Sequence, residues 1–162
     1  MGMPNPSSMV RRQTEAINNQ FDAKKTEVMG QIGGSVAEQI AEIRGKEKDQ
    51  LQAVDAKIQE LERIKSSLSP DDPGKAQIAK QVGILRQQRK QVVAQSRLAV
   101  AAVRANAARE KENIKTRLER EKTRALRQAV EMALSQFSML MAQRRAAAEG
   151  PAGDELRSGN RG

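Results

Sequence analysis

The sequence feature that most limits the possible folds of this chain is a stripe of mainly apolar residues spaced three and four positions apart. Its successive spacings are 3-4-4-3-4-4-3-4-3, which places its members on one face of an α-helix. The stripe begins as an eleven-residue repeat and ends as a heptad, both of which are patterns of helices packed lengthwise. Its one charged member, Glu47, is expected to set register at a cost in stability. The members are Met29, Ile32, Val36, Ile40, Ile43, Glu47, Leu51, Val54, Ile58 and Leu61.

A turn signal separates this stripe from a second helical pattern. Residues 66–74 read SSLSPDDPG, and Asp71 or Asp72 is placed to cap a following helix that has Pro73 near its first position. The fold predicted is all-α: a long, coiled-coil-like antiparallel helical hairpin. The alternative is two helices splayed apart and docked on other subunits. The second stripe consists of Ile78, Val82, Leu85, Val92, Ala99 and Val103, with Arg89 and Ser96 falling on the same seam.

Local composition sets the expected boundaries. Residues 1–8 are expected to form a flexible leader, and residues 149–162 a disordered or extended polar tail. Two adjacent glycines cost roughly 2 kcal/mol relative to alanine inside a helix, so we expect a kink or short break near Gly33-Gly34. The first helical arm is predicted over residues 9–68, the turn over 69–74 and the second arm over 75–148.

The amino-acid composition argues against enzymatic catalysis, against metal binding and against a thick hydrophobic core. The chain has 162 residues with no His, no Cys, no Trp, no Tyr and two Phe. Without His and Cys, the commonest bases, nucleophiles and zinc ligands are missing, so we expect no enzyme, no metal site and no cofactor. Aromatic side chains supply much of the area buried in compact cores. A hairpin with so slim a seam is therefore expected to need other chains, and a homo-oligomeric ring or bundle is predicted.

Positive charge is concentrated in the second half of the chain. Residues 1–70 hold ten Lys/Arg and ten Asp/Glu, so the net charge of +9 belongs to residues 71–162. From Pro73 to Arg109 there is no acidic residue, which removes the i,i+4 pairs of an ordinary surface helix. We expect this stretch to contact nucleic acid non-specifically, through phosphates. The predicted contacts are Lys75, Lys80, Arg86, Arg89, Lys90, Arg97, Arg104 and Arg109.

Residues 130–141 are apolar around almost the whole helix, which indicates burial against something. One reading is docking against Met9, Val10, Ile17 and Phe21 of the first arm. The other is a contact for a partner protein or a membrane surface. The predicted oligomer or partner contacts are Leu51, Val54, Ile58, Leu61, Val130, Leu134, Phe137 and Met141.

The stretch ILRQQRKQVVAQSRLAVAAVRANAARE (Ile84–Glu110), joined to the Met-rich end, resembles the internal core, ejection and pilot proteins of bacteriophage virions in texture. That resemblance implies a structural protein of the virion interior or portal vertex. Its partners would be its own copies and other structural proteins of the particle, and it would help the genome to pass into the cell. The alternatives are a cytoplasmic coiled-coil module, such as a secretion-ATPase stalk or chaperone, and a nucleoid-type DNA-binding protein. In the coiled-coil module the basic helix would face an acidic protein surface.

Overall fold

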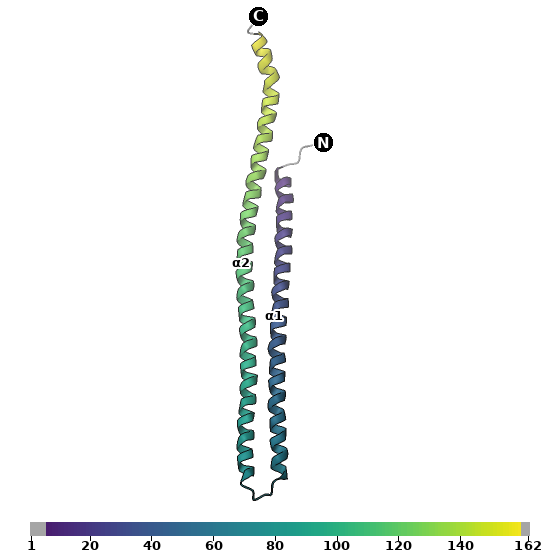
Figure 1. Cartoon of the computed structure of the whole chain (residues 1–162). Helices are drawn as coiled ribbons and strands as arrows, with labels where there is room; N and C mark the ends of the chain where they lie inside the picture. Colours follow the sequence, from purple (N-terminus) through teal and green to yellow (C-terminus); the bar gives the residue numbers. More distant parts are fainter. Residues whose placement is uncertain (1–5, 160–162) are drawn as a thin grey trace. The chain divides into compact units, whose positions relative to one another are not determined.

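The computed structural model describes residues 6–159, with side chains over residues 7–149. Two helices, α1 (Pro6–Ser67) and α2 (Gly74–Gly159), account for this part of the chain apart from the connecting residues 68–73. Figure 1 shows the two helices joined by that turn as a hairpin. The predicted all-α antiparallel hairpin is therefore confirmed.

The turn is built by the residues that the sequence singled out. The Asp72 N–H donates to the Ser69 carbonyl at 3.1 Å, so Pro70 and Asp71 are the central residues of a β-turn, with proline at its favoured position. One carboxylate oxygen of Asp72 then accepts the N–H of Gly74 at 2.9 Å. That contact identifies Asp72 as the N-cap of α2, with Pro73 in the first position, where its missing N–H costs nothing.

The helices are more continuous than their composition predicted. Gly33 and Gly34 lie inside α1, so a short break does not form at this pair. Likewise α2 continues past the expected end at Ala148, and residues 149–159 of the predicted polar tail are helical. Residues 6–8 of the predicted leader belong to α1, and residues 1–5 lie outside the described residues.

The hairpin divides into two compact units, which are described separately. The turn unit comprises residues 28–113, and the terminal unit comprises residues 6–27 and 114–159. In the turn unit every member of the predicted stripe on α1 is buried or half-buried. Ile32 and Val82 are the most enclosed apolar side chains there, at 7% and 6% exposure. Arg89, by contrast, is exposed although the heptad places it on the seam, because its long side chain reaches out to solvent.

Two of the three predicted polar positions of the seam, Glu47 and Ser96, meet each other. The Ser96 hydroxyl, which is buried, donates a hydrogen bond to the half-buried carboxylate of Glu47. The carboxylate is thus partly compensated within an otherwise apolar seam.

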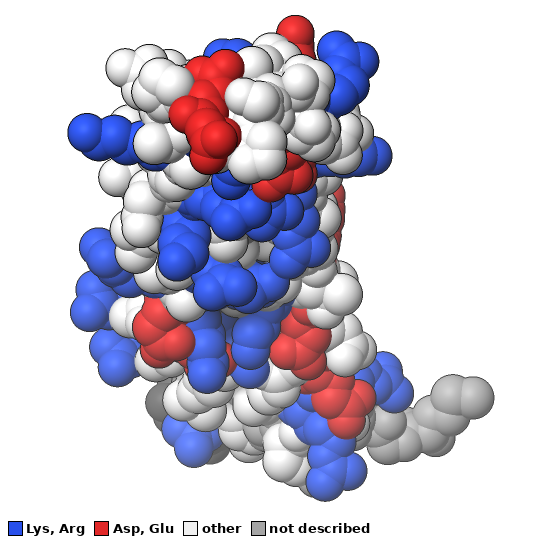
Figure 2. Space-filling view, turned by 90° about the horizontal axis from the view of Figure 1, so that it is seen from below, with Lys and Arg blue, Asp and Glu red and all other residues white. Residues whose placement is uncertain are grey.

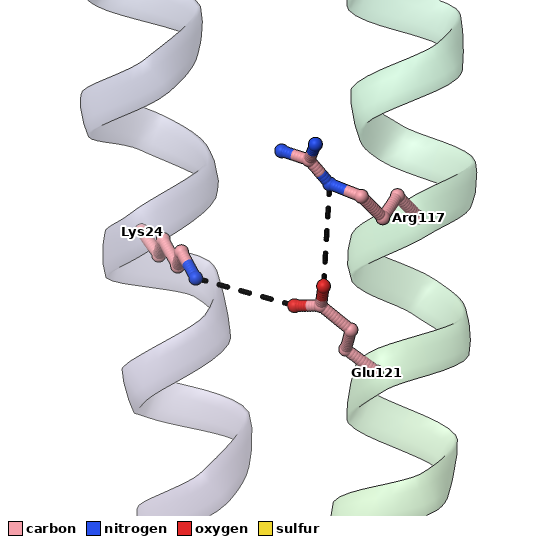
Figure 3. A network of polar contacts seen from close by, with 3 residues as sticks. All are labelled: Lys24, Arg117 and Glu121. Carbon is pink, nitrogen blue, oxygen red and sulfur yellow. Dashed lines mark ion pairs between the residues drawn. The ribbon is translucent and has the colours of Figure 1, made fainter.

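The terminal unit has a core of the same kind. Leu118 and Ala133 are buried at 4% and 1% exposure, and Ile17 and Phe21 of α1 are half-buried. On the surface of this unit the carboxylate of Glu121 lies between Lys24 of α1 and Arg117 of α2, each with an N···O distance of 4.0 Å (Figure 3). Exposed pairs of this length contribute little to stability.

Candidate nucleic-acid interface

All eight cations predicted to contact nucleic acid lie on α2 in the turn unit, and two of them are paired. The Arg86 guanidinium contacts the Glu62 carboxylate at 3.0 Å, and the Arg89 guanidinium contacts Asp55 at 2.9 Å. Both carboxylates belong to α1. These four side chains are 45–65% exposed, so each pair is worth only about 0–1 kcal/mol. A phosphate could compete for either arginine, but only by displacing its carboxylate.

The remaining six cations form no ion pair with any described residue. Lys75 is half-buried beside the turn, and the other five are exposed. Three of these, Lys90, Arg97 and Arg104, follow one another at intervals of seven residues. That interval keeps them on one flank of a coiled-coil helix, about 10.5 Å apart along its axis. Lys111 extends this ladder one step beyond the acid-free stretch.

A groove between the two helices in the turn unit is lined by three arginines. It encloses a volume of about 450 Å³ and contains three guanidinium groups, from Arg44, Arg97 and Arg104. No carboxylate of the described residues forms an ion pair with any of the three. We call this feature the arginine groove. Its full lining is Arg44, Glu47, Val93, Ser96, Arg97, Val100, Ala101 and Arg104.

Arg44 belongs to α1 and was missed by the sequence reasoning, because it lies in the half of the chain whose charges balance. The signal was nevertheless present. Arg44 directly follows a seam residue, Ile43, and so flanks the seam. The Glu47–Ser96 contact fixes the register of the hairpin and places Arg44 opposite the region of Val100. Only the paired structure brings this third arginine to the other two.

The one acid of the groove is Glu47, and its hydrogen bond to Ser96 satisfies part of its charge within the seam. Three guanidinium groups against one carboxylate leave the groove net positive. Guanidinium presents a planar fork of N–H donors that matches phosphate oxygens two at a time.

Arg44 also borders a second groove, of about 400 Å³, that runs along α1 beside Lys48 and Asp55. Figure 2 views the turn end from below, where Lys and Arg side chains predominate and Asp and Glu form smaller, separate groups.

The predicted oligomer contacts fall into two sets. Leu51, Val54, Ile58 and Leu61 are half-buried in the seam between α1 and α2, so the hairpin itself uses them. Val130, Leu134, Phe137 and Met141 are 37–53% exposed. Ala133 is the one buried residue among residues 130–141, and Met9, Val10, Ile17 and Phe21 of α1 are all half-buried, which fits a partial docking of this segment on α1.

Within residues 6–159 no cluster of three or more carboxylates stands close enough to hold a metal ion. No described helix combines the length and the apolar character needed to cross a membrane. Searches for similar proteins found no matching family model, no matching curated protein and no matching solved structure.

Proposed function

We propose that this chain is a non-enzymatic structural protein that self-associates and binds duplex nucleic acid through its phosphates. The setting proposed is the interior of a bacteriophage particle, on the strength of the textural resemblance of Ile84–Glu110 and the Met-rich end. The single observation that carries the binding function is the arginine groove, with three unpaired guanidinium groups drawn from both helices.

The arrangement favours a polyanion over a small anion. The groove continues into the ladder of Lys90, Arg97, Arg104 and Lys111, whose steps of about 10.5 Å let each cation meet a separate phosphate. A single phosphate would engage the groove and leave the rest of the ladder unused. Phosphate contacts position a protein on nucleic acid but read no sequence. The expected binding is therefore sequence-independent and strongly dependent on salt.

The aromatic content favours duplex over single-stranded nucleic acid. Proteins that hold single strands stack bases on aromatic side chains, and this chain has two aromatic residues, Phe21 and Phe137. Both belong to the terminal unit, whereas the cations listed above belong to the turn unit. The turn unit thus offers charge without stacking.

The test is electrophoretic retardation of a random-sequence duplex at several salt concentrations. The triple variant Arg44→Gln, Arg97→Gln and Arg104→Gln removes the groove cations. Because each neutralised phosphate contributes about 0.9 to the slope of log K against log salt, the slope should fall by about 2.7.

The control is Lys46→Gln, Arg86→Gln and Arg89→Gln, which removes the same charge from cations that are already paired with Glu42, Glu62 and Asp55. Its slope should fall clearly less. If the slope falls equally in both variants, binding depends on the net charge of the protein and not on the arginine groove. No retardation of the wild type at low salt would favour an acidic protein surface as the partner.

The virion setting has its own test. Mass spectrometry of purified particles from the source should detect the chain at a fixed ratio to the major structural proteins. Its absence from particles, together with retained duplex binding, would favour a nucleoid-type role.

A further inference from the structure

The exposed apolar segment of α2 in the terminal unit carries two separate stripes. The long stripe is Val130, Leu134, Phe137 and Met141, at spacings of 4-3-4, and its members are 37–53% exposed. The methionine stripe is Met132 and Met139, seven residues apart and each 61% exposed. Side chains of this size at such exposure leave much apolar surface in water.

These stripes lie on opposite sides of the flank that packs on α1. That flank contains the buried residues Leu118 and Ala133. Successive residues of an α-helix are rotated by about 100° around its axis. Measured from the midpoint between Leu118 and Ala133, the long stripe is centred about 100° to one side and the methionine stripe about 80° to the other. Glu131, Ser135 and Ser138 occupy the fourth side. In each copy, α2 therefore has α1 along one flank and two lateral apolar faces that remain partly exposed.

We infer that copies of this chain associate side by side through this segment, with the long stripe of one copy packing on the methionine stripe of the next. The inference rests on the oligomeric part of the proposed function. The 4-3-4 spacing of the long stripe is the pattern that inserts side chains between those of a neighbouring helix. Methionine supplies a flexible counter-surface that fits itself to them. Two different faces in contact make the association heterologous, so each copy can bind two neighbours.

The charge pattern favours a second copy over a lipid surface as the occupant. Helices that lie on membranes combine one apolar face with a polar face rich in Lys and Arg. From Met132 to Gln143 there is no charged residue at all. A flat bilayer surface would cover one stripe and leave the opposite one in water, whereas two neighbouring copies cover both.

The test uses the full chain and three double variants, compared by sedimentation velocity over a range of concentrations. Leu134→Glu with Phe137→Glu disables the long stripe, and Met132→Glu with Met139→Glu disables the methionine stripe. Ser135→Glu with Ser138→Glu adds the same charge to the polar side as a control. Glutamate favours helix, so circular dichroism should show equal helicity in all four proteins.

The wild type and the serine control should form assemblies larger than a dimer. Each stripe variant alone should sediment as a monomer. An equimolar mixture of the two stripe variants should form a dimer and nothing larger, because one intact face of each kind remains.

Three results would overturn the inference. One is a methionine-stripe variant that still dimerises, which would mean that the long stripe pairs with itself. Another is a mixture of the stripe variants that stays monomeric. The third is a monomeric wild type that floats with vesicles of phosphatidylglycerol and phosphatidylethanolamine, which would assign the segment to lipid. Duplex retardation run on the same samples keeps the two proposals apart. If a monomeric variant keeps the wild-type slope of log K against log salt for duplex binding, the nucleic-acid site does not depend on the association.

Discussion

At the scale of single residues, the contact between Ser96 and Glu47 determines how the two helices match. Both residues lie on an apolar seam, where a carboxylate without a donor is costly. Sliding α2 by one heptad in either direction would bring Ser96 opposite Ile40 or Val54 and would separate it from Glu47. The apolar seam residues tolerate such a slip because they resemble one another. This polar pair does not, and it is therefore expected to specify the register, as buried polar residues do in coiled coils.

Ser96→Ala should lower the free energy of unfolding by about 1–3 kcal/mol, because it leaves the Glu47 carboxylate without its donor. Combining Ser96→Ala with Glu47→Leu should restore the stability or raise it above the wild type, since an apolar pair needs no compensation. Urea unfolding followed by circular dichroism at one fixed protein concentration measures both. Ser35→Ala, at an exposed serine of α1, is the control and should change little. A single variant as stable as the wild type would remove Ser96 from this role.

At the scale of elements, the helices owe their continuity to pairing more than to local propensity. Each glycine within α1 costs about 1 kcal/mol relative to alanine, which is too little to interrupt a helix that packs along its length. A β-carbon added at Gly33 or Gly34 would meet no side chain and no backbone of another segment within 4 Å. Neither position needs glycine for conformational reasons, because no described glycine has a positive φ.

Gly33→Ala together with Gly34→Ala should therefore stabilise the chain by about 1–2 kcal/mol. Thermal unfolding monitored by circular dichroism at matched concentration checks this expectation. A lower stability in the double variant would indicate that a neighbouring chain packs closely against these two glycines in the assembly.

The turn offers a sharper test of local chemistry. Asp72→Ala removes the carboxylate that accepts the Gly74 N–H and should cost about 1 kcal/mol of stability. Asp71→Ala is the matched control, because the Asp71 side chain is exposed and forms no hydrogen bond with the described residues. Urea midpoints for the two variants should differ accordingly, and equal midpoints would contradict the assignment of Asp72 as the cap.

Sequence reasoning succeeded wherever the signal was periodic or local. The seam from Met29 to Leu61 and the Asp72 cap follow from spacing and turn chemistry. It failed wherever pairing decides the outcome. α1 is continuous through Gly33-Gly34 because packing along the helix outweighs the low helix propensity of glycine. The arginine groove depends on a register that neither helix contains by itself, so Arg44 remained hidden among the balanced charges of its own half.

At the scale of the whole molecule, a thin core meets a large excess of positive charge. Among the described residues no large side chain is fully buried, and the net charge is +9. Ordering one residue costs roughly 1.5 kcal/mol of conformational entropy, which a seam of half-buried side chains offsets poorly. Self-repulsion among the cations adds to that cost. Burial of the apolar segment at residues 130–141 by other copies, and neutralisation of the cations by a polyanion, would both favour the folded state.

Stability should therefore depend on protein concentration. Association that involves only the folded chain stabilises it by mass action, so the midpoint of thermal unfolding should rise as the wild type is concentrated from micromolar to hundreds of micromolar. The variant Leu134→Glu with Phe137→Glu should unfold at a lower temperature that stays constant over the same range, because it lacks the apolar contact through which copies are proposed to meet. Added duplex at low salt should raise both midpoints, since the cations of the turn unit are intact in both proteins. If the unfolding midpoint of the wild type does not change with concentration, the hairpin is stable without other copies. The small apolar area of its seam would then be no reason to expect assembly.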